Sequence, residues 1–247
     1  MVGSAAACLV VLPMVLCGRE YEYTLNMIFE AWVAKSARHL FIGPMKVVNA
    51  SNIGSVGGKG CKPAIYIANH GSMVDIMMLY ELNVNFVWIS KKAVALMPGV
   101  GQIMYLSGHV LLDRGGRESV KQMFRKCNEK LTNGRNIFIF PQGTRDRITS
   151  PPLPFKHGAF SIALNHPNGP VDVIPVSIDI VPKCWTQNIP FLSAITGKNC
   201  ATITVHPKMD TKKYLDMGED GKKVMMEESR EIIYSVLGGT GGEKKNE

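Results

Sequence analysis

Residues 64–75 read Ala-Ile-Tyr-Ile-Ala-Asn-His-Gly-Ser-Met-Val-Asp, and they contain the clearest signals of fold and function in the chain. The first five residues form a short apolar run, as in a strand that is buried on both faces. Residues 73–82 are rich in long apolar side chains, which indicates a helix. The stretch therefore predicts a strand, a turn and a helix, with polar side chains in the turn.

The turn places His70 five residues before Asp75. If both residues were helical, their side chains would point about 140° apart around the axis. They can meet only if His70 precedes the helix and Asp75 lies in its first turn. Ser72 favours this geometry, because Ser-x-x-Asp before an apolar run is typical of a capping box. An imidazole held by a carboxylate can act as a general base, although the same residues also fit a simple helix cap beside an ordinary turn histidine.

The size and charge of the chain limit its partners. With 247 residues it fits one sizeable domain, or one domain with a small appendage. The formal net charge is +8, and residues 1–206 hold 20 basic against 11 acidic side chains. Such a surface favours anionic partners. The aromatic residues do not alternate with basic ones, and no helix-turn-helix or zinc-finger spacing occurs. We therefore expect no nucleic-acid partner.

The six cysteines are widely scattered and include no Cys-x-x-Cys pair. This pattern argues against both a disulfide scaffold and a zinc site. We expect no metal, and reduced thiols in a domain that faces the cytosol.

The N-terminal part of the chain is apolar and aromatic. Residues 2–17 form a nearly uninterrupted apolar run, which is shorter than the ~20 residues of a comfortable membrane span. A cleaved signal peptide is less favoured, because the basic region that usually precedes one is missing. Residues 21–42 are amphipathic. We predict a membrane-associated helical segment over residues 1–48, inserted or lying in the interface. A pair of core helices is the alternative.

Further along the chain, residues 49–63 are predicted to be a linker, 64–236 an α/β domain, and 237–247 a disordered tail. Within the domain, strand and helix patterns alternate. Strands are expected at 64–68, 85–89, 109–112, 136–140, 173–180 and 201–205, and helices at 73–82, 93–105, 117–132, 157–165 and 222–236. Alternation of this kind predicts a largely parallel sheet flanked by helices, with ligands bound at the carboxyl ends of the strands.

Three other segments carry polar groups that could meet a ligand. Residues 140–145 lie at the end of an expected strand. Gly143 would let the backbone come close to a ligand, because it has no side chain. Thr144 offers a hydroxyl, and Arg145 offers a planar guanidinium that can hold two phosphate oxygens. Asp113-Arg114 ends another strand, but could be a plain surface ion pair. Lys156 precedes an expected helix and could help to bind an anion there. Each segment is a weak signal by itself.

Taken together, these segments resemble the sequence blocks of the glycerolipid acyltransferases of the lysophosphatidic acid acyltransferase type. Residues 69–75 resemble the family's Asn-His-x-Ser-x-x-Asp motif. Four further blocks follow in the family's order over residues 64–206: Ser90-Lys91-Lys92 with Pro98 and Gly101, Gly108 to Arg114, Phe140 to Arg145, and Ile174-Pro175-Val176. One block alone would be weak, but five in order are highly specific.

The resemblance implies an O-acyltransferase that makes phosphatidic acid for phospholipid synthesis. His70 would take the proton from a glycerol hydroxyl as this attacks an acyl thioester, and Asp75 would orient His70. The phosphate and the glycerol of 1-acylglycerol 3-phosphate would be held by a set of residues comprising Gln142, Gly143, Thr144, Arg145, Arg114 and Lys91. No cofactor is implied, since acyl-CoA or acyl carrier protein is a co-substrate. The implied partners are the two substrates and a membrane surface, while the oligomeric state stays open.

Two positions depart from the family pattern. Gln142 and Ala93 stand where the family usually has glutamate. A glutamine can accept a hydrogen bond from a glycerol hydroxyl, but it brings no charge. A lower activity or a different acceptor, such as glycerol 3-phosphate or lysophosphatidylcholine, would follow. Two other hypotheses stay open: a serine hydrolase that uses Ser72, and a non-catalytic lipid-binding protein.

The location of the protein is indicated only weakly. The tail contains Lys244-Lys245, which resembles a dilysine retrieval signal of the endoplasmic reticulum. A plastid and a bacterial inner membrane are the alternative locations.

Overall fold

The computed structural model describes Glu22 and residues 24–58, 60–97, 100–112, 116–146, 152–186, 189, 190, 192 and 200–237. Some predictions concern residues outside this set: the apolar run 2–17, Pro98, Asp113, Arg114 and the Lys244-Lys245 tail.

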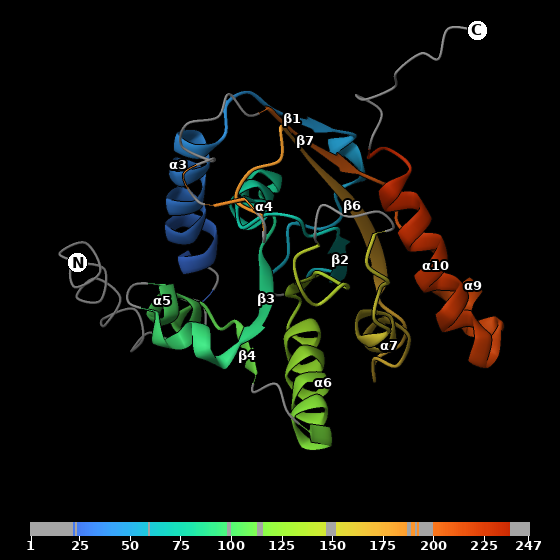
Figure 1. Cartoon of the computed structure of the whole chain (residues 1–247). Helices are drawn as coiled ribbons and strands as arrows, with labels where there is room; N and C mark the ends of the chain where they lie inside the picture. The colour runs from blue at the N-terminus through green and yellow to red at the C-terminus, as the bar shows by residue number, and fades with distance from the viewer. Residues whose placement is uncertain are drawn as a thin grey trace, which may run out of the picture.

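A seven-stranded sheet forms the centre of the protein (Figure 1). Its strands are β1 (Met45–Val48), β2 (Ala64–Ala68), β3 (Phe86–Lys91), β4 (Val110–Leu112), β5 (Asn136–Ile139), β6 (Asp172–Val181) and β7 (Cys200–Val205). The order across the sheet is β1-β7-β6-β2-β5-β3-β4. The five strands from β6 to β4 are parallel, whereas β7 is antiparallel to β6, and β1 runs parallel to β7. The predicted largely parallel sheet is thus confirmed.

The sheet also contains a strand that the sequence did not predict. β1 pairs with β7, from Met45 opposite Ala201 to Val48 opposite Thr204. Four residues that we had assigned to the N-terminal segment therefore lie within the sheet. A strand this short, with a lysine in it, gives little periodic signal.

Helices cover both faces of the sheet, with α3 and α4 on one side and α6, α7 and α10 on the other (Figure 1). The longer helices are α3 (Ala31–Phe41), α4 (Val74–Leu79), α5 (Val100–Leu106), α6 (Gly116–Thr132), α7 (Gly158–Leu164), α9 (Thr211–Asp216) and α10 (Gly221–Tyr234). Shorter turns are η1 (Leu25–Glu30), η2 (Ala50–Asn52), η3 (Tyr80–Leu82), η4 (Lys92–Leu96) and η5 (Gly218–Asp220). All five helical regions predicted within the domain are present, and α9 is additional.

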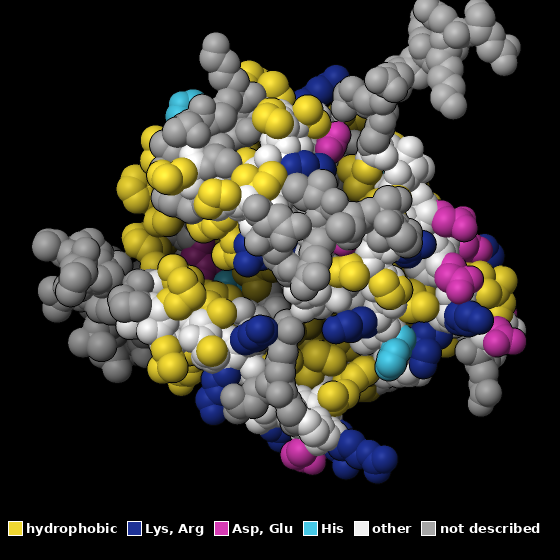
Figure 2. Space-filling model, in the orientation of Figure 1, with side chains coloured by type: hydrophobic (Ala, Val, Ile, Leu, Met, Phe, Trp, Pro, Cys, Tyr) yellow, Lys and Arg dark blue, Asp and Glu magenta, His cyan; other side chains and the backbone are white. Residues whose placement is uncertain are grey.

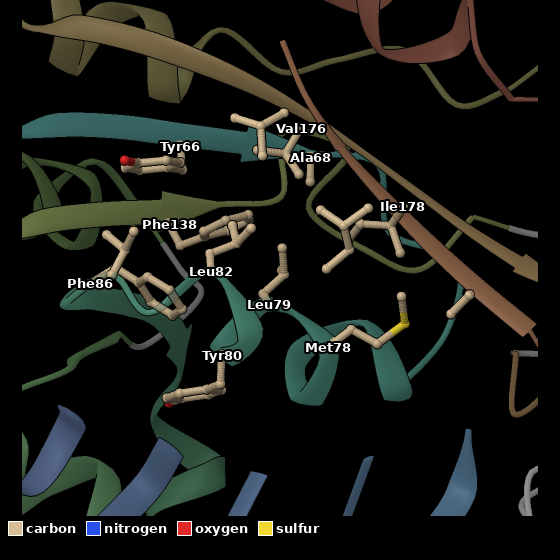
Figure 3. Packing of buried hydrophobic residues seen from close by; sticks show 14 of the residues in the cluster. Tyr66, Ala68, Met78, Leu79, Tyr80, Leu82, Phe86, Phe138, Val176 and Ile178 are labelled. Atoms are coloured by element: carbon tan, nitrogen blue, oxygen red, sulfur yellow. The ribbon is translucent and has the colours of Figure 1, made fainter. Parts of the chain in front are cut away.

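Alternate residues of the central strands enter two separate cores. In β2, Tyr66 and Ala68 face the core beneath α3 and α4, whereas Ile65 and Ile67 face the core beneath α6, α7 and α10. Figure 3 shows the first core, in which Met78 and Leu79 of α4 pack beneath the sheet residues. Because β2 is buried on both faces, it forms a rigid base for the turn that follows it.

The N-terminal helices are joined to the domain by a buried polar network. Glu30, at the end of the π-helical turn η1, accepts hydrogen bonds from Asn26 (2.7 Å), Tyr80 (2.9 Å) and Nε2 of His109 (3.0 Å). Burial raises the pKa of Glu30, but His109 and the hydrogen-bond donors around it lower the pKa below its usual value. The backbone N–H of Trp88 donates to Nδ1 of His109. The network therefore anchors residues 25–41 to β3 and β4.

Within the described residues, no helix combines the length and the apolar composition that crossing a lipid bilayer requires.

Candidate active site

The turn between β2 and α4 is organised around one carboxylate. Oδ2 of Asp75 accepts hydrogen bonds from Nδ1 of His70 (2.9 Å), the N–H of Gly71 (2.8 Å) and the N–H of Ser72 (2.9 Å). Asp75 is only 2% exposed. The predicted geometry is therefore confirmed: His70 precedes the helix, Asp75 lies in its first turn, and the two side chains meet.

Ser72 fixes where the helix starts. Its Oγ accepts from the N–H of Val74 (3.2 Å), and Asp75 accepts from the N–H of Ser72, which is one half of the predicted capping box. The N-cap of α4 is Met73, one residue after Ser72. The Ser72 hydroxyl donates to the carbonyl of Cys184 (2.8 Å). Ser72 is buried and engaged in these bonds, so the geometry argues against the serine-hydrolase hypothesis.

The ring of His70 has a defined orientation. It stacks on the ring of Phe140, with 4.0 Å between ring centroids and 14° between planes. Because Asp75 is an acceptor, Nδ1 of His70 carries the hydrogen, which leaves a lone pair on Nε2. A neutral imidazole in this tautomer can accept a proton at Nε2 while the nearby carboxylate stabilises the cation that forms.

Asn69 joins the end of β2 to β6. Its amide donates to the carbonyl of Ile178 and its side-chain oxygen accepts from the N–H of Ile178, both at 2.8 Å. The sequence motif included Asn69, but we had assigned it no role. The structure shows that it fixes the backbone directly before His70.

Gln142 does not lie where a substrate-binding side chain was expected. Its side chain is 2% exposed, and Oε1 accepts from the backbone N–H of His70 (2.7 Å). Its amide nitrogen donates to Oδ2 of Asp146 (3.1 Å) and to the hydroxyl of Tyr234 (2.9 Å). Gln142 is therefore a support of the turn that contains His70, because protein groups engage both ends of its amide.

The other residues predicted to bind phosphate follow the ends of β5 and β3. Gly143 has a φ of 72°, which favours glycine, and a Cβ there would lie 2.8 Å from Nζ of Lys156. Lys156 thus contributes an ammonium group beside the segment of Thr144 and Arg145. Lys91 is exposed at the end of β3, which is adjacent to β5 in the sheet. Arg114 lies outside the described residues.

Sequence reasoning missed three residues that contact or support the histidine turn. The ring of Phe140 stacks on His70, the N–H of Asp146 donates to the carbonyl of His70 (2.6 Å), and Tyr234 reaches the site from α10. Asp146 directly follows the quoted block, so its position was a signal that could have been used. Tyr234 is 164 residues from His70 in the sequence, and no local pattern indicates the contact.

The site can thus accept a proton at Nε2 of His70. The backbone of Gly143 and the ammonium group of Lys156 could bind an anion. Among the described residues, no group of three or more histidine, cysteine or acidic side chains is arranged to hold a metal ion. The fold places these groups at the carboxyl ends of parallel strands, where α/β sheets bind their ligands.

Comparison with known proteins identifies the class to which this fold and site belong. The family model described as Acyltransferase matches residues 45–179, which is more than half of the chain. The protein therefore belongs to this acyltransferase family, as the order of the sequence blocks predicted.

Individual relatives point in the same direction. Proteins named 1-acyl-sn-glycerol-3-phosphate acyltransferase match from Chlamydomonas reinhardtii (38% identical, 47% of this chain and 34% of the relative) and Arabidopsis thaliana (chloroplastic; 33%, 61% and 41%). One from Saccharomyces cerevisiae is 31% identical over 77% of this chain and 61% of its own. The matches thus span about a third to three fifths of these relatives.

A solved structure supports the fold. The crystal structure of the 1-acyl-sn-glycerophosphate acyltransferase PlsC from Thermotoga maritima superposes with a TM-score of 0.67. The superposition covers 94% of this chain and 86% of that one, at 23% sequence identity. The two proteins share the α/β architecture.

The two hydrogen bonds between Asn69 and the backbone of Ile178 provide a test of how the site is held. In the Asn69→Ala variant, both backbone groups of Ile178 lose a buried partner, so we expect unfolding to become easier by about 2–4 kcal/mol. Urea denaturation followed by circular dichroism measures this change. Asn168→Ala, at an exposed asparagine, is the control and should change stability by less than about 0.5 kcal/mol. Equal stability of the two variants would contradict the stabilising role of the hydrogen bonds between Asn69 and Ile178.

Proposed function

We propose that the protein transfers a fatty acyl group from an acyl thioester to the free hydroxyl of 1-acylglycerol 3-phosphate, which forms phosphatidic acid. The observation that carries this proposal is the contact of His70 with an Asp75 carboxylate that two backbone N–H groups also hold. The names of the relatives agree with this reaction.

The proposed reaction proceeds by direct attack of the acceptor hydroxyl. Nε2 of His70 takes the hydroxyl proton as the oxygen bonds to the thioester carbonyl carbon, and Asp75 stabilises the imidazolium. The tetrahedral intermediate then expels the thiolate, which takes the proton back from His70. The products are the ester and the free thiol of coenzyme A or of acyl carrier protein. The donor enters as a co-substrate, and neither a cofactor nor a covalent acyl-enzyme is needed.

Arg145 is proposed to bind the phosphate of the acceptor, with Thr144 and the backbone of Gly143 beside it. Lys91 and Arg114 are further candidates, and Lys156 joins them because its ammonium group lies next to Gly143. A planar guanidinium can hold two phosphate oxygens at once. This set favours a phosphomonoester acceptor over a zwitterionic one, so lysophosphatidic acid is preferred to lysophosphatidylcholine. Glycerol 3-phosphate is the main competing acceptor.

We also propose that the protein works at a membrane surface. Hydrophobic side chains are exposed along η1 and α3 and along η4 and α5, and α5 packs against η1. Figure 2 shows such side chains gathered over α3 and α5. The most exposed are Ile28, Trp32, Leu40, Leu96, Met97 and Tyr105. An apolar patch with basic residues near it, such as Lys35 and Lys92, suits the interface of an anionic bilayer. The candidate membranes are those of the endoplasmic reticulum, of a plastid and of a bacterial cell.

Replacement of either member of the proposed catalytic pair should stop the chemical step. We expect His70→Ala and Asp75→Asn each to lower kcat by at least about 100-fold, because the base or its orientation is lost. The assay measures phosphatidic acid formed from acyl-CoA or acyl carrier protein thioester and lysophosphatidic acid. Glycerol 3-phosphate and lysophosphatidylcholine are tested in parallel.

His39→Ala, at an exposed histidine, is the control and should retain activity. Full turnover by the His70→Ala variant would contradict the mechanism, and wild-type protein inactive with every acceptor would favour a lipid-binding role.

Removal of Arg145 should weaken binding of the acceptor. Loss of charge-assisted hydrogen bonds to phosphate predicts a KM for lysophosphatidic acid about 10- to 100-fold higher in Arg145→Ala. Arg145→Lys keeps the charge but not the fork, so an intermediate KM is expected. Arg125→Ala changes an exposed arginine of α6 and serves as the control. A KM in Arg145→Ala equal to that of the wild type would rule out this role.

Charges placed in the apolar patch should reduce membrane binding. We expect the double variant Trp32→Glu/Leu96→Glu to bind vesicles of phosphatidylcholine and phosphatidylglycerol at least about tenfold more weakly, since two apolar side chains that would enter the bilayer are lost. Co-sedimentation measures the partition. Val120→Glu places the same charge on exposed α6 and should leave binding nearly unchanged. If the double variant partitions like the Val120→Glu control, this patch is not the docking surface.

A further inference from the structure

A closed ring of hydrogen bonds lies directly behind the histidine turn. The amide nitrogen of Gln142 donates to both Oδ2 of Asp146 and the hydroxyl of Tyr234. The Tyr234 hydroxyl in turn donates to Oδ2 of Asp146 (3.3 Å). The N–H of Leu153 donates to the same oxygen (3.2 Å). We call Gln142, Asp146 and Tyr234 the positioning unit.

The positioning unit holds the backbone of His70 from two sides. Oε1 of Gln142 accepts from the N–H of His70, and the N–H of Asp146 donates to the carbonyl of His70. With the ring stacked on Phe140 and Nδ1 bound to Asp75, both the main chain and the side chain of His70 are constrained.

The charge of Asp146 selects the orientation of the Gln142 amide. A carboxylate can only accept hydrogen bonds, so it requires the NH₂ end of the amide to face it. The oxygen end must then face the N–H of His70. In the reverse orientation, two donors would meet at His70 and two acceptors at Asp146, and both contacts would be repulsive.

Tyr234 keeps its proton in this setting. Burial, and next the negative charge of Asp146, raise the pKa of the Tyr234 hydroxyl above its usual value. The guanidinium of Arg230 lies 5.7 Å from the centre of the Tyr234 ring. The hydroxyl therefore remains a hydrogen-bond donor to Asp146, and it connects the end of α10 to the site.

We propose that the positioning unit needs one negative charge, which Asp146 supplies in this chain, and that the neutral Gln142 transmits its orienting effect to His70. A glutamate at position 142 would place a second carboxylate about 3 Å from Asp146, where the amide of Gln142 now lies, and two carboxylates that close cannot both be ionised without a large cost. Gln142 and Asp146 are therefore a matched pair, in which one residue supplies the charge and the other the neutral amide.

The matched pair predicts a compensating effect between two substitutions. Gln142→Glu should lower kcat by about tenfold or more, with the KM for the acceptor changed less than about threefold, because the base is displaced while the phosphate site is untouched. In Gln142→Glu/Asp146→Asn the single charge moves to position 142, where the new carboxylate can accept from the amide NH₂ at position 146 and from Tyr234. The N–H of Leu153 loses its acceptor in this variant, so activity should recover in part and not in full. This double variant should be at least about fivefold more active than Gln142→Glu. Gln122→Glu, at an exposed residue of α6, controls for the added charge and should match the wild type.

A second measurement separates this proposal from the proposed function, on which its kinetic readout rests. Urea unfolding of the same variants needs no substrate. Gln142→Glu should lower the midpoint, and the added Asp146→Asn should raise it again. If the wild-type protein is inactive with every acceptor, the proposed function is wrong. The urea unfolding of these variants then still tests the matched pair. A double variant that is less stable than Gln142→Glu, or less active than it, would overturn the matched pair.

Discussion

One oxygen atom, Oδ2 of Asp75, accepts hydrogen bonds from the side chain of His70 and from the backbone of the next two residues. These bonds require the chain to turn sharply between the end of β2 at Ala68 and the start of α4 at Val74. The turn places Gly71 and Ser72 so that their N–H groups converge on the buried carboxylate and satisfy its oxygen. The contacts that bring the chain into α4 are thus the same contacts that orient the imidazole, and the proposed catalytic pair could not form without them.

The elements around this turn restrict it further. β2 is buried on both faces, Asn69 joins it to β6, and Phe140 presents a flat ring to the imidazole. Each contact comes from a different strand, so the sheet sets the position of His70. This explains how a short loop can have a well-defined geometry: its freedom is removed by neighbours that the parallel sheet brings to one edge.

Local patterns predicted much of this arrangement. The apolar run of β2, the Ser-x-x-Asp spacing and the alternation of strands and helices were sufficient for the fold class and for the contact of His70 with Asp75. They were not sufficient for β1, which is too short to show a period, or for Tyr234, whose contact depends on where α10 packs. Gln142 was expected to face a substrate, because the resemblance to the acyltransferases implies that residues 140–145 bind the acceptor. The structure instead buries it, since the neighbouring Asp146 and the N–H of His70 satisfy both ends of its amide.

The buried Glu30 network has a consequence for the N-terminal helix. Apolar contacts alone would let a helix roll about its axis, because they have little directionality, whereas hydrogen bonds do not tolerate such rotation. Glu30 accepts hydrogen bonds from Tyr80 and His109, which lie outside its own helical segment, so η1 and the α3 helix that continues it are held at one roll angle. A shift of one residue would rotate the helix by about 100° and would turn Trp32 away from its outward position. For the proposed membrane surface, the roll angle sets which side chains of α3 face the lipid, and with them the tilt at which the protein would rest on it.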